Sequence, residues 1–180
     1  KSDEKVKFLD NCPECDTPLI RKEGEAQHFC PNELGCPPQI KGRIEHFIGR
    51  RAMDIEGIGA ETVDAMVNLG LIQTAADLYS LTFDKVVELE RMADKSADNL
   101  IKGIEKSKEN PFEKVLFGIG VRYVGETVAK KLAKRFKSME NLSKASYDEL
   151  VSTDEIGEVI AISVQNFFLE EKNVAFVNQL

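Results

Sequence analysis

Residues 121–129 read Val-Arg-Tyr-Val-Gly-Glu-Thr-Val-Ala, and their pattern occurs four times along the 180-residue chain. In each copy an apolar anchor is followed by Gly or Ala, and a small or apolar residue comes four positions later. The anchors recur at intervals of 34, 32 and 32 residues: Ile58, Met92, Val124 and Ile156. Eight residues after each anchor lies a second apolar residue: Met66, Leu100, Leu132 and Val164. A fixed period of this length is typical of a repeated supersecondary unit.

Each copy predicts a helix, a tight turn and a second helix, which is the pattern of the helix-hairpin-helix motif. The anchor fills the angle between the helices, and the small residue lets them cross closely. Amides in the turn and at the start of the second helix have no partner within the helix, and the helix dipole favours an anion there. A phosphodiester oxygen fits such a site without any base contact. We expect the four units near residues 43–81, 82–110, 111–142 and 143–180.

Two glycine pairs compete for the turn of the third unit. With Ile119 of Gly118-Ile119-Gly120 as the anchor, the intervals become 27 and 37 and the residue eight positions later is the polar Thr127. With Val124 as the anchor, both intervals are 32. Gly125 is therefore predicted to form the phosphate-facing turn, whereas Gly118 and Gly120 are predicted to end the preceding helix.

The candidate DNA contacts follow from this register. Four come from the first unit: Gly57, Ile58, Gly59 and Thr62. Eight come from the third unit and its lysine-rich helix: Arg122, Tyr123, Val124, Gly125, Thr127, Lys130, Lys131 and Lys134. The fourth unit adds Ile156 and Gly157. A run of lysines on a helix is often only a solvated face, and Phe136 in the same helix is expected in the core.

The second unit is expected to be a scaffold or a weaker contact. Arg91 and Ala93 occupy positions where glycine would be preferred, and alanine resists positive φ. Arg91, Lys95 and Ser96 are still candidates for a phosphate contact.

All four cysteines lie in the first 36 residues, with the spacing C-x2-C-x14-C-x5-C: Cys12, Cys15, Cys30 and Cys36. Strands at 18–22 and 26–29, joined by a turn at 23–25, would bring the two pairs together. Four thiolates form a closed tetrahedral site, as in structural zinc. Two disulfides or a rubredoxin-like iron site are the alternatives, but the absence of later cysteines favours a metal. His28 could also ligate, although a position on the strand surface is the simpler interpretation.

The net charge of −7 argues against general attraction to nucleic acid, but the charge is unevenly distributed. Residues 113–137 carry seven Lys or Arg and two acids, whereas residues 138–180 carry two Lys and eight acids. DNA binding would therefore depend on local patches. There is no apolar run long enough for a membrane span. Because the chain starts at Lys1 and not at Met, we expect a fragment, in which the absence of an apolar signal segment carries little weight.

The predicted fold is mainly α. A small β-hairpin zinc module with four cysteine ligands, at residues 1–42, precedes an all-α domain of four helix-hairpin-helix repeats at residues 43–180.

Taken together, these features resemble the C-terminal part of bacterial NAD-dependent DNA ligases. The resemblance rests on five motifs: CPEC at 12–15, CPNELGCPPQ at 30–39, MDIEGIG at 53–59, LERMADKSADNL at 89–100 and RYVGETVAKKLA at 122–133. It implies an enzyme that seals nicks in duplex DNA during replication and repair, in the bacterial cytoplasm and in association with the nucleoid. The zinc module would connect to an upstream oligonucleotide-binding barrel, and the hairpins would grip the minor-groove side of the duplex around the nick.

The chain has no Lys-x-Asp-Gly motif, which carries the nucleophilic lysine of that family. The resemblance therefore implies that NAD and magnesium bind in absent upstream adenylation domains, that a BRCT domain follows downstream, and that this chain is inactive alone. Two alternatives remain: another helix-hairpin-helix repair factor, such as a nuclease subunit or junction binder, and a protein-interaction module. A nucleotide-binding enzyme is disfavoured because Tyr123 occupies the third glycine position of GxGxxG.

Overall fold

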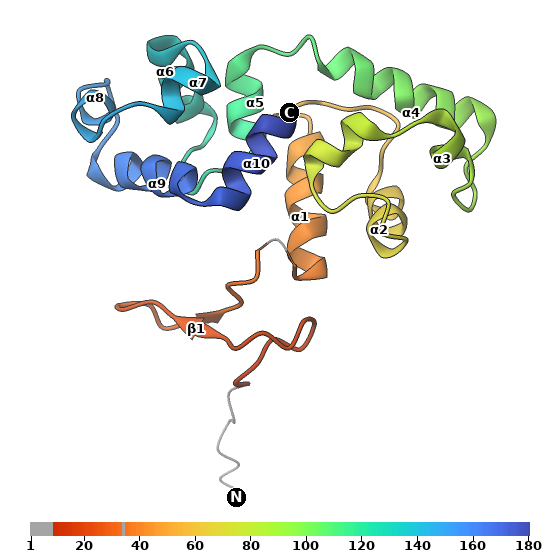
Figure 1. The fold of residues 1–180 in the computed structure, drawn as a ribbon, viewed down its shortest axis with the longest axis horizontal. Coiled ribbons are helices and arrows are strands. Elements are labelled where there is room, and N and C mark those ends of the chain that lie inside the picture. Colours follow the sequence, from red (N-terminus) through yellow and green to blue (C-terminus); the bar gives the residue numbers. More distant parts are fainter. Residues whose placement is uncertain (1–8, 34) are drawn as a thin grey trace, which may run out of the picture.

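The computed structural model describes residues 9–33 and 35–180 and is mainly helical, as expected (Figure 1). The zinc-module hairpin consists of β1 (Ile20–Arg21) and β2 (His28–Phe29). The helices of the first two units and their connection are α1 (Pro37–Ile48), α2 (Ala60–Asn68), the 3-10 helix η1 (Ala75–Ser80), α3 (Phe83–Val87) and α4 (Asp94–Ser107). The remaining helices are α5 (Phe112–Gly118), α6 (Glu126–Phe136), α7 (Met139–Ser143), α8 (Tyr147–Val151), α9 (Glu158–Leu169) and α10 (Glu171–Gln179).

The two strands are antiparallel, with Ile20 opposite Phe29 and Arg21 opposite His28. The predicted hairpin is confirmed, but each strand is only two residues long. Gly24 reverses the chain with a φ of +83°, in the left-handed region that favours glycine. Residues 20–28 are all exposed, so no buried core holds this hairpin in place. The first eight residues of the predicted zinc module lie outside the described residues.

The helices form two lobes, one on each side of α1 (Figure 1). The core of the first lobe contains side chains from α1, α2 and α4, such as Phe47, Met66 and Leu100. The core of the second lobe contains side chains from α5 to α9, such as Leu132 and Leu150. Each lobe therefore holds two of the four units around its own apolar centre.

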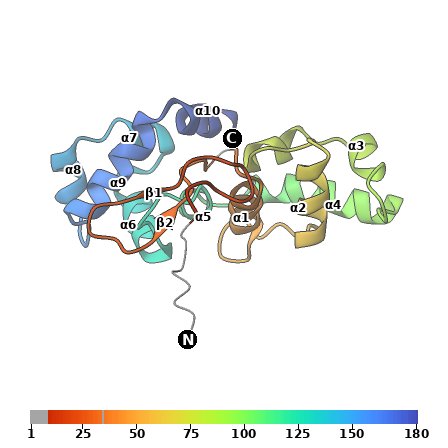
Figure 2. The same cartoon turned by 90° about the horizontal axis from the view of Figure 1, so that it is seen from below.

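Contacts from α1 and α10 join the lobes. In α1, His46 Nε2 donates a hydrogen bond to the Phe117 carbonyl over 2.8 Å. In α10, which lies between the lobes in both views, Phe176 packs against both cores (Figures 1 and 2). Gln179 Nε2 also donates to Asp77 Oδ1 of η1 over 2.7 Å. The C-terminal helix thus closes the gap between the two halves.

The predicted repeat is confirmed. Its four helix pairs are α1/α2, α3/α4, α5/α6 and α8/α9, and three of the four anchors are buried, with Met92 half-buried. The small residues of the pattern are 0–1% exposed, which is what lets the paired helices cross closely: Val63, Ala97, Ala129 and Ala161. Because α1 begins at Pro37, its helix runs through residue 42, where the sequence suggested a boundary.

The backbone of the turns differs from the sequence expectation in one respect. The residue before each anchor has positive φ: Gly57 (+87°), Arg91 (+62°), Tyr123 (+67°) and Glu155 (+63°). The residue after each anchor, including Ala93 with a φ of −78°, is an extended N-cap. The reasoning that Ala93 would resist the turn was therefore wrong, because positive φ is required two residues earlier.

Gly118 and Gly120 lie at the C-terminal end of α5, as predicted. Gly120 has a φ of +71°, and its N–H donates to the Phe117 carbonyl over 3.2 Å. Gly118 is the last residue of α5, and a Cβ there would lie 3.2 Å from the Phe47 ring. Across the described residues, no helix has the length and apolar character needed to cross a bilayer.

Candidate metal centre and nucleic-acid interface

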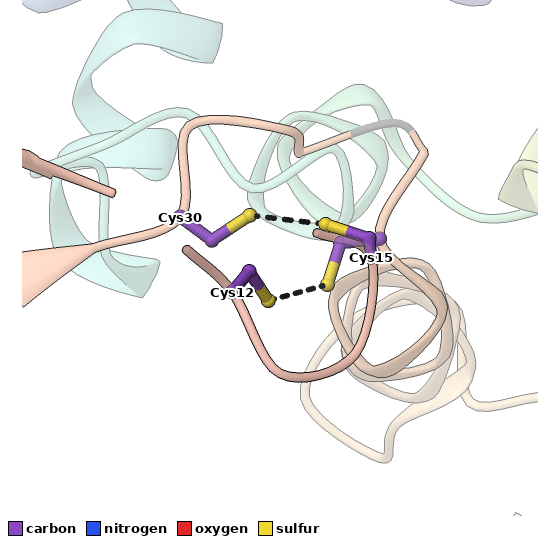
Figure 3. Close-up of side chains that lie close together, drawn as sticks. Cys12, Cys15 and Cys30 are labelled. Carbon is purple, nitrogen blue, oxygen red and sulfur yellow. Dashed lines mark hydrogen bonds between the residues drawn. The ribbon is translucent and has the colours of Figure 1, made fainter. Parts of the chain in front are cut away.

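The four cysteine sulfurs converge on one point, each within 4.8 Å of the others. Figure 3 shows the thiols of Cys12, Cys15 and Cys30 pointing toward one another. The Sγ atoms of Cys15 and Cys30 are 3.5 Å apart, and those of Cys12 and Cys36 are 3.9 Å apart. In a tetrahedral site with Zn–S bonds of about 2.3 Å, the sulfurs are about 3.8 Å apart. The spacing therefore fits a tetrahedral metal site and is too long for disulfide bonds.

The thiols lie in contrasting environments. A hydrogen bond to the Thr17 hydroxyl, 3.2 Å away, is the main cause that lowers the pKa of Cys15 to about 6. Desolvation raises the pKa of Cys36 to about 12, and desolvation also raises the pKa of Cys30. A divalent cation among the sulfurs would offset the cost of holding buried thiolates, because coordination removes the thiol protons. The closed four-sulfur set has no position for a substrate, so the metal that it holds is structural.

The cysteine cluster is joined directly to the helical part of the chain. Cys36 is the N-cap of α1, and its carbonyl accepts the first helical hydrogen bond, from Ile40 N–H, over 3.0 Å. Gln39 in the first turn of α1 donates to the Cys30 carbonyl over 3.1 Å. His28, the other ligand considered, lies in β2 opposite Arg21. The metal site thus fixes where α1 begins.

The second helix of each unit starts without a side-chain cap. Its N-cap is Gly59, Ala93, Gly125 or Gly157, and none of these supplies an acceptor for the amides of the first turn. By contrast, the hydroxyls of Ser138 and Ser146 cap α7 and α8. The first-turn amides of the repeat helices are therefore left for an acceptor from outside, at the end of the helix that favours an anion.

Space is also left open at the three glycine N-caps. A Cβ built on Gly59, Gly125 or Gly157 would meet no atom within 4 Å, and the φ values there are ordinary negative ones. Neither backbone conformation nor internal packing requires glycine at these positions. Without a side chain at these positions, a ligand backbone can come closer to the amides at the start of the helix.

The third unit has the most basic turn. Arg122 and Tyr123 are exposed, and the Arg122 guanidinium lies 5.0 Å from the centre of the Tyr123 ring. The Ser163 hydroxyl of α9 donates to the Arg122 carbonyl over 2.5 Å, which fixes the turn against the fourth unit. In α6, Lys130 and Lys134 are exposed, while Ala129, Leu132 and Phe136 are buried as the helical pattern predicted.

Lys131 differs from its neighbours because it faces the fourth turn. Its ammonium lies 3.1 Å from Asp154 and 3.9 Å from Glu155, and these contacts raise the pKa of Lys131, the Asp154 hydrogen bond most of all. The fourth turn therefore holds carboxylates close to Ile156 and Gly157. These carboxylates oppose the approach of a phosphate to the fourth turn.

The first two units place the remaining predicted residues around their turns. Gly57 packs closely on α4, since a Cβ there would lie 3.2 Å from Leu100 Cα. Thr62 is half-buried in the first turn of α2. Arg91, Lys95 and Ser96 are exposed around the second turn, so the structure leaves all three accessible to a ligand.

Sequence reasoning missed the acids that contact the third unit. Glu25, in the turn of the zinc hairpin, lies 3.4 Å from Arg122, which is 97 residues away. Asp154 pairs with Lys131, which lies 23 residues earlier in the chain. No local pattern signals such contacts, although the asymmetry between basic and acidic segments suggested that opposite charges could meet.

Comparison with known proteins matches each part of the chain to a family. Residues 11–37 match the NAD-dependent DNA ligase C4 zinc finger domain. Residues 50–106 match a SAM-like helix-hairpin-helix tandem, and residues 114–177 match a helix-hairpin-helix motif. The four-cysteine cluster in a C4 zinc finger domain implies structural zinc.

Among curated relatives, the chain is 64% identical over 175 residues to a DNA ligase of Christiangramia forsetii and 60% identical over 177 residues to one of Bacteroides fragilis. These alignments cover 97% and 98% of this chain but 26% and 27% of the two ligases. The chain thus spans about a quarter of the length of these relatives. Over nearly its whole length, the chain is homologous to the C4 zinc finger and helix-hairpin-helix DNA-binding region of bacterial NAD-dependent DNA ligases.

Proposed function

We propose that the chain holds duplex DNA by its phosphates, without reading base sequence, within a ligase that seals nicks during replication and repair. The observation that carries this proposal is the set of repeat helices whose N-termini are uncapped and, at three glycines, open to approach. Unpaired amides at a helix N-terminus bind an anion regardless of the base attached to it.

The contacts proposed are those in the predicted register. The amides after Gly59, Gly125 and Gly157 would donate to phosphates, with Arg122, Lys130 and Lys134 adding charge around the third turn. The second turn would add Arg91, Lys95 and Ser96. Because the fourth turn is acidic, we propose that the third turn contributes most of the electrostatic attraction.

The zinc module, within residues 1–42, would act as a rigid connector to upstream domains, and the repeats in 43–180 as the grip on the minor-groove side. The adenylation chemistry, with its NAD and magnesium, would belong to parts of the ligase outside this chain. The 180-residue chain should therefore bind a nick without sealing it.

A titration at several salt concentrations tests the proposal. The zinc-loaded chain is mixed with labelled duplexes of two unrelated sequences, each intact or nicked, and binding is followed by fluorescence anisotropy. Binding should weaken steeply with salt and be nearly equal for the two sequences. No binding at about 50 mM salt, where phosphate contacts are strong, would contradict the proposal and favour a protein-interaction module.

The Lys130→Ala variant assigns one charge within this interface. It should weaken binding to both sequences equally and lower the slope of log K against log salt by about one. Lys144→Ala, which removes an exposed lysine at the C-cap of α7, is the matched control and should leave the slope unchanged. Equal slopes for Lys130→Ala and the wild type would remove Lys130 from the interface.

A further inference from the structure

The turn of the zinc hairpin reaches across to the third repeat. Glu25 Oε1 lies 3.4 Å from the Arg122 guanidinium, and the two side chains are 45% and 50% exposed. The pair spans a cleft of about 760 Å³ whose walls include Lys22, Tyr123 and Ile162. A carboxylate from the zinc module therefore neutralises the cation of the turn proposed to bind phosphate.

In the described part of the chain, apolar packing does not fix the hairpin turn in that place. The side chains of residues 20–28 are all exposed, so burial of apolar surface does not fix it. Within the turn, Glu25 N–H donates to the Lys22 carbonyl over 3.0 Å, and Arg21 Nε donates to the Glu25 carbonyl over 2.5 Å. These bonds shape the turn itself. Among the described residues, Glu25–Arg122 is the ion pair that joins the turn to the third repeat.

The backbone of Arg122, by contrast, is held within the repeat turn. Its carbonyl accepts the Ser163 hydroxyl over 2.5 Å, and its guanidinium lies over the Tyr123 ring. Val124, two residues further on, is buried as the anchor of the unit. The backbone that carries the cation is thus fixed in the repeat, whereas the carboxylate partner sits on an exposed hairpin turn.

We propose that Glu25 occupies the place of a DNA phosphate on Arg122, so that phosphate binding at the third turn displaces the zinc hairpin. The inference rests on the proposed DNA binding and adds a competitor and a movement to it. A phosphate accepts hydrogen bonds from a guanidinium through the same bidentate geometry as a carboxylate. An exposed ion pair is weak and is screened by salt, so DNA can replace it.

DNA binding would then be coupled to the position of the zinc module. While Glu25 pairs with Arg122, the hairpin turn lies against the third unit; with a phosphate on Arg122, the turn is free to move about the cysteine cluster. Whatever precedes the zinc module in the chain would be reoriented only after the third turn has engaged the duplex.

A set of variants with a matched control tests the competition. Glu25→Gln removes the paired charge, and Glu23→Gln removes an equal charge from the same exposed turn. At low salt, Glu25→Gln should tighten binding to an intact duplex by about two- to fivefold, the range of an exposed ion pair. Glu23→Gln should give less than half of that gain. In an Arg122→Gln background, the two glutamate changes should have equal effects.

Hydrogen exchange of the amides of residues 22–25 tests the movement. In the wild type, exchange should speed up when duplex DNA is added, while in Glu25→Gln it should already be fast without DNA. Unchanged helix content and zinc content show that the variants are folded. If wild-type chain fails to bind DNA, the proposed function itself fails. If DNA binds but Glu25→Gln equals Glu23→Gln, or if exchange slows on binding, the displacement is refuted and the proposed function stands.

Discussion

Gly125 has an ordinary φ of −84°, and a Cβ there would meet no atom within 4 Å. Its side chain is therefore not excluded by the fold. Replacing it with leucine should lower the free energy of unfolding by only about 1 kcal/mol, the difference between glycine and an apolar residue at an N-cap. The leucine would project over the first-turn amides of α6, and DNA affinity should fall by about tenfold, the equivalent of losing about 1.4 kcal/mol of phosphate contact.

Gly118→Leu is the contrasting variant for this prediction. A Cβ at Gly118 would lie 3.2 Å from the Phe47 ring and 3.4 Å from the Ala52 Cβ, so this change should act first on stability. Thermal unfolding and duplex titration of both variants make the comparison. Wild-type affinity in Gly125→Leu would show that DNA does not approach α6 at its N-terminus.

At the scale of single residues, the sequence predicted which side chains of the repeat are buried, but it did not predict the backbone conformation of the turns. Burial of Leu132 and Ala129 follows from spacing alone, because each lies one or two helical turns beyond the anchor. The positive φ of Tyr123 was missed, since a bulky residue is uncommon in that region and the glycine beside the anchor is the expected choice. Only the closed turn, fixed by Val124 N–H donating to the Val121 carbonyl over 3.0 Å, requires it.

Two helices each contain an interior glycine, and the two glycines have opposite surroundings. In α4, a Cβ on Gly103 would lie 2.5 Å from the Glu56 carbonyl oxygen, because the helix backbone approaches the first turn closely. In α1, a Cβ on Gly42 would meet nothing within 4 Å. Gly103→Ala should therefore destabilise the protein by about 1–3 kcal/mol, the range for overpacking. Gly42→Ala should stabilise it by about 0.5–1 kcal/mol, as alanine does in an open helix.

Denaturant unfolding of the two alanine variants gives both values from one experiment. A stabilising Gly103→Ala would mean that α4 does not approach the first turn as closely as the structure shows. Unchanged stability in Gly42→Ala would mean that this face of α1 is not open.

The zinc module is an element whose order depends on its metal. Residues 20–28 are all exposed, so the hairpin has little core of its own once the cysteine cluster is opened. Chelation of the zinc should expose four titratable thiols and remove hydrogen-exchange protection from residues 11–36, while most helical circular dichroism remains. The Cys12→Ser variant should behave like the chelated protein. Loss of all helical signal on chelation would show that the lobes also depend on the metal.

The extent of each element was harder to predict than its presence. The cysteine spacing predicted the hairpin, and the 32- to 34-residue period predicted the helix pairs. The start of α1 at Pro37 was missed, because the cysteine motif and the helix overlap at Cys36, which serves both. A proline at the first helical position is in fact a common helix start, and it was the available signal.

At the scale of the whole molecule, the arrangement of the lobes lies beyond what periodicity can predict. The repeat defines four similar units but not which pairs share a core. Nor does it define how the two lobes meet, which depends on contacts between distant residues, such as His46 with the Phe117 carbonyl, 71 residues apart. The acidic C-terminal segment gave no sign that α10 would return to pack between the lobes, because its helix is only weakly apolar and mostly exposed.

Phe176 is the side chain of α10 that packs against both cores, so it tests whether the lobes act together. Because it is half-buried, Phe176→Ala should destabilise the protein by about 1–2 kcal/mol, less than the loss of a fully buried phenylalanine. Val174→Ala, an exposed position on the same helix, should change stability by less than about 0.5 kcal/mol.

DNA binding uses turns from both lobes in the proposed interface, and a fixed spacing between them raises the effective concentration of the second contact. Phe176→Ala should therefore weaken duplex binding, although no residue of the proposed interface is changed, and Val174→Ala should not. The measurement is duplex titration of both variants at a temperature where each is fully folded by circular dichroism. Equal DNA affinity for the two variants would show that each lobe binds independently and that α10 only stabilises the fold.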